Sequence, residues 1–429
     1  MDGGLILFYL FAATSAMYVM HFGMYLVGAN FYDMWQFKRR HHLAAARRHS
    51  AHAEPLVSLL IPAHNEEKVI LRCLQSIRAG SHQNLQIIVI DDASKDNTYN
   101  LVLEYKREHP DTDLSIVRRY KNVGKGQGLN YALQHRAKGK LVMTLDADSM
   151  LEHDTIKNAV SYFDDPSIVG VAANVRIIEE PTILGILQKF EHMIGYRSKK
   201  TYSLTKSEFV IGGVASTYRM EVLKEVGFYD TDTWTEDIGL SIKIISNMGN
   251  RNYKIIYAAD VTALTEGVAT FRGLLKQRFR WKYGSLQNVV KYRHLIFNLD
   301  KRFTRRLTWY RLPMAIIGEF AILCAPLLWG YVVYISLATH SLQLFAGAYL
   351  TITIYTLLTL WYDEHLPKLY CLRLSCYTPF LYFIFYLMDL IQFIAVVKCL
   401  MRTHRLVGQQ DQKSTWVSPQ RVGRQVVTG

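Results

Sequence analysis

Leu141-Val142-Met143-Thr144-Leu145-Asp146-Ala147-Asp148 is an apolar run that ends in two carboxylates. Five apolar or β-branched residues in a row are typical of a strand buried on both faces, as in the centre of a parallel sheet. Open α/β sheets bind ligands at the edge formed by the carboxyl ends of their strands. Two acidic side chains at that edge suit a hard divalent cation that also touches a phosphate. The alternative is a solvated Asp pair in a turn.

Strand and helix patterns alternate around this stretch from about residue 55 onward. The predicted strands cover residues 57–63, 85–90 and 114–118, and the predicted helices cover residues 66–79, 97–108 and 127–138. This alternation predicts an α/β domain with a doubly wound, mostly parallel sheet.

Polar residues follow three of these strands where each one ends. They occur in the segments 62–66 (Pro-Ala-His-Asn-Glu), 91–94 (Asp-Asp-Ala-Ser) and 146–148. Because parallel strands end at one edge, the three segments predict a shared ligand site. A nucleotide sugar would fit, since carboxylates accept hydrogen bonds from uracil N–H and ribose hydroxyl groups. In the glycine-rich turn 122–128, Lys125 could face a phosphate, or the turn could simply be a flexible helix start.

Apolar segments long enough to cross a bilayer lie on both sides of this domain. Residues 3–32 contain no Lys, Arg, Asp or Glu, and further apolar runs lie near 313–338, 342–362 and 377–397. The net charge of +14 is concentrated partly beside these runs, as at residues 38–40. Such clusters indicate the cytoplasmic side of a membrane and its anionic lipids, and no nucleic-acid-binding module is present.

These patterns divide the chain into six parts. They are an N-terminal transmembrane helix (1–35), a basic juxtamembrane linker (36–54), a cytosolic catalytic domain (55–265), interfacial amphipathic helices (266–312), C-terminal transmembrane helices (313–400) and a polar tail (401–429). We expect a multi-pass protein of the cell membrane with its N-terminus outside. Four spans would then leave the C-terminus outside, whereas Lys398, Arg402 and Arg405 favour the cytoplasm. Either a run such as 377–397 is interfacial or the charge rule fails here.

Two later segments carry residues suited to group transfer. Asp237 opens a predicted helix and could serve as a general base, or it could only cap that helix. Gln277, Arg280 and Trp281 share one face of a helix predicted over residues 271–290. Arg280 would hold a phosphate and Trp281 would support a sugar ring. The alternative is an amphipathic helix at the membrane surface.

Taken together, the motifs from residue 55 to 290 resemble the family 2 inverting glycosyltransferases. The match rests on the polar strand ends, Gly124-Lys125, Thr235-Glu236-Asp237 and the QxxRW pattern at residues 277–281. The last pattern, with flanking spans, looks like the processive branch, which includes cellulose, chitin, hyaluronan and poly-N-acetylglucosamine synthases. Within that branch, the contexts of residues 211–214 and 234–238 look closest to bacterial poly-β-1,6-N-acetylglucosamine synthases.

The resemblance implies a GT-A-like fold and assigns roles to individual residues. It implies catalytic roles for Asp237, Glu236 and Arg280, acceptor contacts for Trp281, Gly212 and Gly213, and Mg²⁺ or Mn²⁺ bound by Asp146 and Asp148. The implied donor-binding residues are Pro62, Asn65, Glu66, Asp91, Asp92, Lys125, Asp146, Gln277 and Arg280.

The implied activity is the polymerisation of N-acetylglucosamine from UDP-GlcNAc into a β-linked polysaccharide, with translocation of the product. The partners would be the UDP-sugar donor, the growing polysaccharide, the lipid bilayer and a small membrane accessory subunit, and no nucleic acid. The alternatives are a hyaluronan- or chitin-oligosaccharide-type synthase and a non-processive lipid glycosyltransferase. A catalytically inert polysaccharide export subunit is an alternative of another class.

Overall fold

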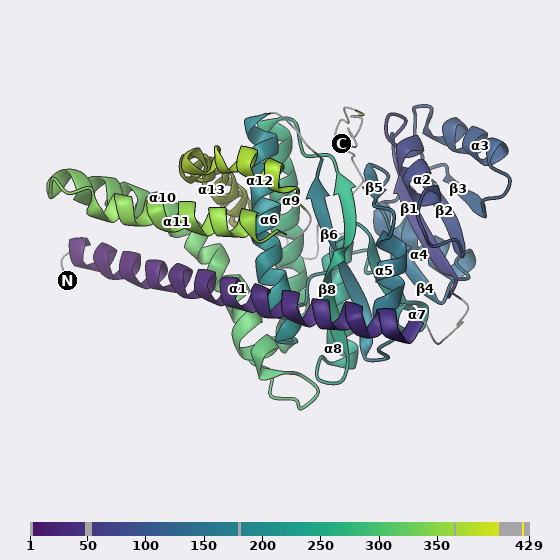
Figure 1. The fold of residues 1–429 in the computed structure, drawn as a ribbon, viewed down its shortest axis with the longest axis horizontal. Coiled ribbons are helices and arrows are strands. Elements are labelled where there is room, and N and C mark those ends of the chain that lie inside the picture. Colours follow the sequence, from purple (N-terminus) through teal and green to yellow (C-terminus); the bar gives the residue numbers. More distant parts are fainter. Residues whose placement is uncertain (1–2, 48–53, 179–181, 364–365, 403–422, 424–429) are drawn as a thin grey trace.

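The computed structural model describes residues 3–47, 54–178, 182–363, 366–402 and 423 (Figure 1). Its strands are β1 (Val57–Ala63), β2 (Leu85–Asp92), β3 (Leu114–Arg119), β4 (Leu141–Thr144), β5 (Ser149–Leu151), β6 (Ile168–Ile177), β7 (Ser216–Arg219) and β8 (Lys254–Thr265). The helices beside the sheet are α2 (Ile70–Arg78), α3 (Thr98–Glu108), α4 (Lys125–His135), α5 (Thr155–Tyr162), α7 (Met220–Glu225) and α8 (Glu236–Met248).

Across the described residues these strands form one sheet in the order β3-β2-β1-β4-β7-β6-β8-β5. The half from β3 to β4 is parallel, as predicted, and its strands alternate with helices. The other half is mixed, because β7 runs antiparallel to β4 and β6, and β5 runs antiparallel to β8. β7 starts opposite the last residue of β4, with Ser216 paired to Thr144, so the chain enters it from the carboxyl edge.

The parallel strands are buried on both faces, which explains their continuous apolar runs. Successive side chains of a strand point to opposite faces. Leu60, Ile88 and Val142 accordingly join an apolar cluster on one face of the sheet, while Leu59 and Met143 join the cluster on the other. Helices cover both clusters, and the polar ends of the strands remain at the carboxyl edge.

A second group of helices extends away from the sheet domain. It comprises α1 (Gly3–Arg47), α10 (Leu312–Ala338), α11 (Gln343–Trp361), α12 (Lys368–Ser375) and α13 (Thr378–Leu400). Within the described residues, three helices are long and apolar enough to span a membrane, namely Leu5–His41, Arg306–Ala338 and Thr378–Leu400, and Phe345–Trp361 is a shorter apolar helix. The segment 36–47, predicted as part of a linker, continues the first helix to Arg47.

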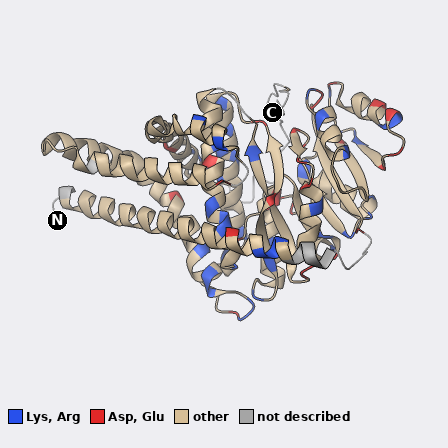
Figure 2. Cartoon of the chain, viewed as in Figure 1, with Lys and Arg blue, Asp and Glu red and all other residues tan. Residues whose placement is uncertain are grey.

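Two further helices, α6 (Ile183–Leu204) and α9 (Phe271–Lys291), stand between the sheet and the apolar helices (Figure 1). Lys and Arg residues gather along these helices, whereas the far ends of α1, α10 and α11 are almost free of charged residues (Figure 2). This distribution matches helices that lie at the surface of a bilayer beside helices that enter it.

α1 is fixed to the sheet domain through an irregularity in β8. The β6–β8 register jumps between the pairs Ala173–Ala258 and Asn174–Thr262, so several residues of β8 bulge out of the ladder. The fully buried Tyr32 of α1 donates its hydroxyl hydrogen to the Tyr257 carbonyl at 2.8 Å and accepts from the Ala259 N–H at 3.3 Å. Tyr32 thus satisfies one backbone group within the bulge, at Ala259, and one just before it, at Tyr257.

Tyr32→Phe should lower the stability of the full-length protein. It leaves a buried carbonyl and a buried N–H without their partner, which costs about 1–3 kcal/mol. We expect a lower apparent melting temperature in detergent, whereas Tyr120→Phe, at a side chain that is 92% exposed, should leave it unchanged. Equal melting temperatures for both variants would show that the two hydrogen bonds of the Tyr32 hydroxyl do not contribute to stability.

Candidate active site

The carboxyl ends of β1 and β2 are tied together by side chains predicted to bind a donor. The Asn65 side-chain oxygen accepts from the Lys95 N–H at 2.8 Å, and Asp91 Oδ1 accepts from the Ser94 N–H at 3.1 Å. Asn65 and Ala93 both have left-handed backbone conformations, with φ of 56° and 62°. Such conformations are unfavourable for residues with a Cβ and concentrate at functional sites.

Asp92 fixes the loop that leads into α4. Its carboxylate accepts hydrogen bonds from the N–H groups of Val123 at 3.3 Å and Gly124 at 3.0 Å. α4 begins at the next residue, so the first side chain of that helix is Lys125. Asp91 and Asp92 are almost completely buried, as is Glu66 at the end of β1. The three predicted strand ends therefore form one continuous edge of the sheet.

The Lys125 ammonium lies among three carboxylates at this edge. Its Nζ is 2.6 Å from Asp146 Oδ1 and 3.4 Å from Glu236 Oε1. Burial opposes its charge, but Asp146, Glu236 and Asp237 outweigh burial and raise the pKa of Lys125. The lysine therefore stays protonated. We call Lys125, Asp146, Glu236 and Asp237 the acidic cluster.

Gly213 is the residue that lets these groups come together. A Cβ at this position would lie 2.8 Å from Lys125 Nζ, 3.4 Å from Asp237 Oδ2 and 3.9 Å from Asp146 Oδ1. Its carbonyl accepts a hydrogen bond from Thr144 Oγ1 at 3.1 Å, which holds the segment against the end of β4. Backbone rather than side chain thus forms this wall of the cluster.

Asp237 has the properties of a titratable base. Burial raises the pKa of Asp237 to about 6, with a further contribution from the charge of Glu236, while Lys125 and the Ile238 N–H oppose the rise. That N–H donates to Asp237 Oδ1 at 2.9 Å within the first turn of α8. The capping alternative is therefore partly realised, but the other oxygen, Oδ2, lies toward Gly213 and the cluster.

Asp146 and Asp148 have the chemistry of a divalent cation site. Asp148 is 4% exposed, and its Oδ1 accepts from Ser149 Oγ at 3.1 Å. Asp146 already holds one cationic group, the Lys125 ammonium. In the part of the chain that the structure describes, no three His, Cys, Asp or Glu side chains gather as a metal site. Two hard carboxylates suit a Mg²⁺ or Mn²⁺ ion whose other ligands are water and diphosphate oxygens.

The QxxRW segment lies on α9, but its buried cation is one that sequence reasoning missed. Arg278 is 3% exposed, forms an ion pair with Glu191 of α6 and lies 4.3 Å over the Trp281 ring. Its Nη1 donates to Gln277 Oε1 at 3.2 Å. Arg280 is exposed, and among the described residues it makes no hydrogen bond or ion pair. Its predicted donor contact stays a prediction, as does the acceptor contact of Trp281.

The second half of α9 holds the start of α8 in place. Asn288 Nδ2 donates to the Thr235 carbonyl at 3.1 Å and to its Oγ1 at 3.0 Å. Gln287 Oε1 accepts from the Trp234 N–H at 2.9 Å. A Cβ at Gly284 would lie 2.6 Å from Thr235 Oγ1, so helix and loop are in direct contact. α9 therefore sets the position of Asp237, two residues beyond Thr235.

Gly284→Ala should destabilise this junction. The added methyl group overlaps Thr235, and such overpacking costs about 1–3 kcal/mol. The matched change Gly195→Ala, at an exposed helical position with no neighbouring atom within 4 Å, should be neutral or slightly stabilising. Thermal unfolding of both full-length variants tests the contact, and a Gly284→Ala protein as stable as Gly195→Ala would contradict it.

Comparison with known proteins agrees with this geometry. Residues 58–227 match the family model described as "Glycosyl transferase family 2". A poly-beta-1,6-N-acetyl-D-glucosamine synthase of Staphylococcus epidermidis is 30% identical over 270 residues, which are 62% of this chain and 63% of that protein. The synthase of Staphylococcus aureus (strain COL) is 31% identical over 238 residues, or 55% of this chain and 56% of that protein. The chain thus spans less than two thirds of the length of these relatives.

Among solved structures, the mannosyltransferase from Pyrobaculum calidifontis in complex with GDP-Man and Mn²⁺ has a similar fold. The TM-score is 0.62 at 22% identity, over 91% of this chain and 99% of that one. At this identity the likeness concerns the fold alone, and it confirms the expected GT-A-like α/β domain joined to helices. Together with the matched motifs, these findings identify residues 58–227 as a glycosyl transferase family 2 domain.

Proposed function

We propose that this protein is a membrane-embedded inverting glycosyltransferase that polymerises N-acetylglucosamine from UDP-GlcNAc into a β-linked polysaccharide and exports it. The observation that carries the proposal is the acidic cluster, in which Asp237, a carboxylate with a pKa near 6, lies next to Lys125 and Asp146. The names of the similar synthases support the choice of sugar.

The chemistry follows from the charges at this edge. Direct displacement requires a group that takes the proton of the acceptor hydroxyl as its oxygen attacks the anomeric carbon. Asp237 would take this proton, and the bond from the anomeric carbon to the UDP oxygen would break as the new glycosidic bond forms. Glu236 keeps the pKa of Asp237 high enough for this role. Lys125 would balance the negative charge that develops on the departing diphosphate.

Donor and cation would share the carboxyl edge of the sheet. Asp91, Asp92, Asn65 and Glu66 line the ends of β1 and β2, where the uridine would bind. A Mg²⁺ or Mn²⁺ ion held by Asp146 and Asp148 would neutralise diphosphate charge. The similar mannosyltransferase was solved with Mn²⁺ and a nucleotide sugar, which supports this assignment.

The acceptor would contact Trp281 of α9 and the Gly212-Gly213 segment. Trp281 is partly exposed and is held by Arg278 at the ring, so it offers a fixed surface for a terminal sugar. α9 also packs against the apolar helix α13. This continuity supports a path for the polymer from the site into the membrane, with the catalytic domain on the cytoplasmic side.

The central experiment is incubation of the purified full-length protein with a panel of UDP-sugars, followed by size and linkage analysis of the product. We expect long polymer from UDP-GlcNAc, none with a chelator, and restoration by Mg²⁺ or Mn²⁺. Asp237→Asn should retain UDP binding but lose roughly 10²-fold or more in turnover. Products that carry a single added sugar would favour a non-processive lipid glycosyltransferase. A preference for another sugar would favour a hyaluronan-type synthase. The absence of any transfer would favour an inert export subunit.

The pH dependence should report the titration of Asp237. The base form is needed, so turnover should be complete above pH 6 and fall as pH drops through about 6. Glu236→Gln removes a charge that raises this pKa and should move the acid limb to lower pH. Lys125→Met removes a charge that lowers the pKa of Asp237, so it should move the acid limb to higher pH. This shift is expected whatever the effect of the substitution on the maximal rate. An acid limb unmoved in both variants would exclude Asp237 as the titrating base.

A further inference from the structure

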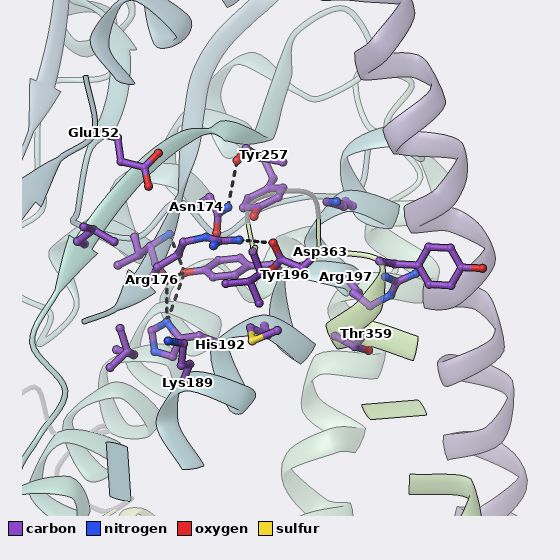
Figure 3. Close-up of a pocket in the computed structure, with 18 of the residues that line it drawn as sticks. Glu152, Asn174, Arg176, Lys189, His192, Tyr196, Arg197, Tyr257, Thr359 and Asp363 are labelled. Atoms are coloured by element: carbon purple, nitrogen blue, oxygen red, sulfur yellow. Dashed lines mark hydrogen bonds and ion pairs between the residues drawn. The ribbon is translucent and has the colours of Figure 1, made fainter. Parts of the chain in front are cut away.

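A cavity outside the acidic cluster lies where the sheet domain meets the apolar helices. It has a volume of about 210 Å³ and is bounded by the β8 bulge, α6 and the end of α11 (Figure 3). None of the residues predicted to bind donor, acceptor or metal lines it. One face of α6 supplies a wall, at spacings of three and four residues, with Lys189, His192, Met193, Tyr196, Arg197 and Lys200.

The lining is both basic and apolar. Four Lys and Arg side chains line the cavity against two carboxylates, Glu152 and Asp363. Two of these cations are already paired, because Arg176 pairs with Asp363 at 2.5 Å (Figure 3) and Lys200 pairs with Asp33 of α1 at 2.5 Å. The rings of Tyr196 and Tyr257, stacked 5.2 Å apart, and several aliphatic side chains form the remaining walls. Such a lining suits an anion that carries an apolar portion.

Arg197 is the residue whose environment is incomplete. It is 4% exposed, and its Nη2 donates only to neutral acceptors of α1, the Leu26 carbonyl at 3.2 Å and Asn30 Oδ1 at 3.3 Å. Its buried Nε has no hydrogen-bond partner, and among the residues that the structure describes no carboxylate forms an ion pair with it. A buried guanidinium N–H without an acceptor is costly, since the group has lost its water and gained no hydrogen bond in return.

Arg176 has a counter-ion but shares one deficit with Arg197. Its Nη2 donates to Asp363, whereas its buried Nε has no hydrogen-bond partner. Both arginines line the same cavity. Guanidinium groups bind both carboxylates and phosphates in a bidentate way, and a phosphate group has enough oxygens to accept from two arginines at once.

We propose that this cavity binds an anionic phosphate group through Arg197 and Arg176, and that its apolar walls receive the adjoining part of an amphiphile. Because the end of the apolar helix α11 lines the cavity, a membrane lipid headgroup is the natural source of the phosphate, and a small soluble phosphate is the other. The ligand would lock α6, α1 and α11 together. It would thereby stabilise the junction between the sheet domain and the membrane helices.

Thermal unfolding of the full-length protein in a neutral detergent tests this binding. The additives are phosphatidylglycerol, phosphatidylcholine and inorganic phosphate, each titrated separately. We expect phosphatidylglycerol to raise the melting temperature saturably and phosphatidylcholine to act much more weakly. Arg197→Gln and Arg176→Gln should each weaken the apparent affinity roughly 10- to 100-fold, the scale of a lost charge-assisted hydrogen bond. Arg272→Gln, at an exposed arginine of α9, is the matched control.

The outcomes separate the sources and can overturn the proposal. The same variant pattern with inorganic phosphate alone would identify a soluble phosphate as sufficient. Arg197→Gln also loses the hydrogen bonds to α1 and can fail to fold for that reason. In that case Arg176→Gln and Lys189→Gln are the test variants, since neither residue makes these bonds. No saturable effect on the unaltered protein, equal effects of both lipids, or equal losses in Arg272→Gln would refute an anion site here.

Discussion

The half-buried ammonium of Lys125 is the constraint on which the candidate site depends. Three carboxylates within one cluster repel one another, and burial strengthens that repulsion because the local dielectric is low. One lysine at 2.6 Å from Asp146 and 3.4 Å from Glu236 makes the arrangement tolerable. The lysine can reach this place only because Asp92 anchors the preceding loop and Gly213 leaves room for the side chain. The end of β2, the loop before α4 and Gly213 therefore fix the position of Lys125 together.

α9 extends this unit toward the apolar helices. Its later residues hold the loop before Asp237, while its middle contacts α6 through the Arg278–Glu191 pair and α10 through Lys282 and Glu319, 2.8 Å apart. Toward α13, Arg402 lies 5.0 Å over the Phe279 ring. A displacement of α9 would therefore change the position of Asp237 as well as the packing of the apolar helices. One rigid helix couples the two halves of the molecule.

Sequence reasoning recovered the features that depend on local pattern. Apolar runs located the parallel strands, and polar residues after them located the edge, because both follow from strand periodicity and sheet topology. The predicted helix at 66–79 begins only at Ile70, because residues 67–69 form a turn that the Val69 N–H closes on the Glu66 carbonyl. The antiparallel β7 and β5 have no local signal. The Arg278–Glu191 pair joins residues far apart in sequence, so no spacing rule could select Arg278 over Arg280.

The β8 bulge shows how an irregularity can serve two purposes. Breaking the ladder leaves Ala259 outside it, so its backbone groups must find partners elsewhere. The Tyr32 hydroxyl accepts from the Ala259 N–H, and Asn174 Nδ2 donates to the Ala259 carbonyl at 3.0 Å. Asn174 and Ala259 also line the cavity that Arg176 and Arg197 border. The same local departure from sheet geometry therefore contributes both to the docking of α1 and to the wall of the basic cavity.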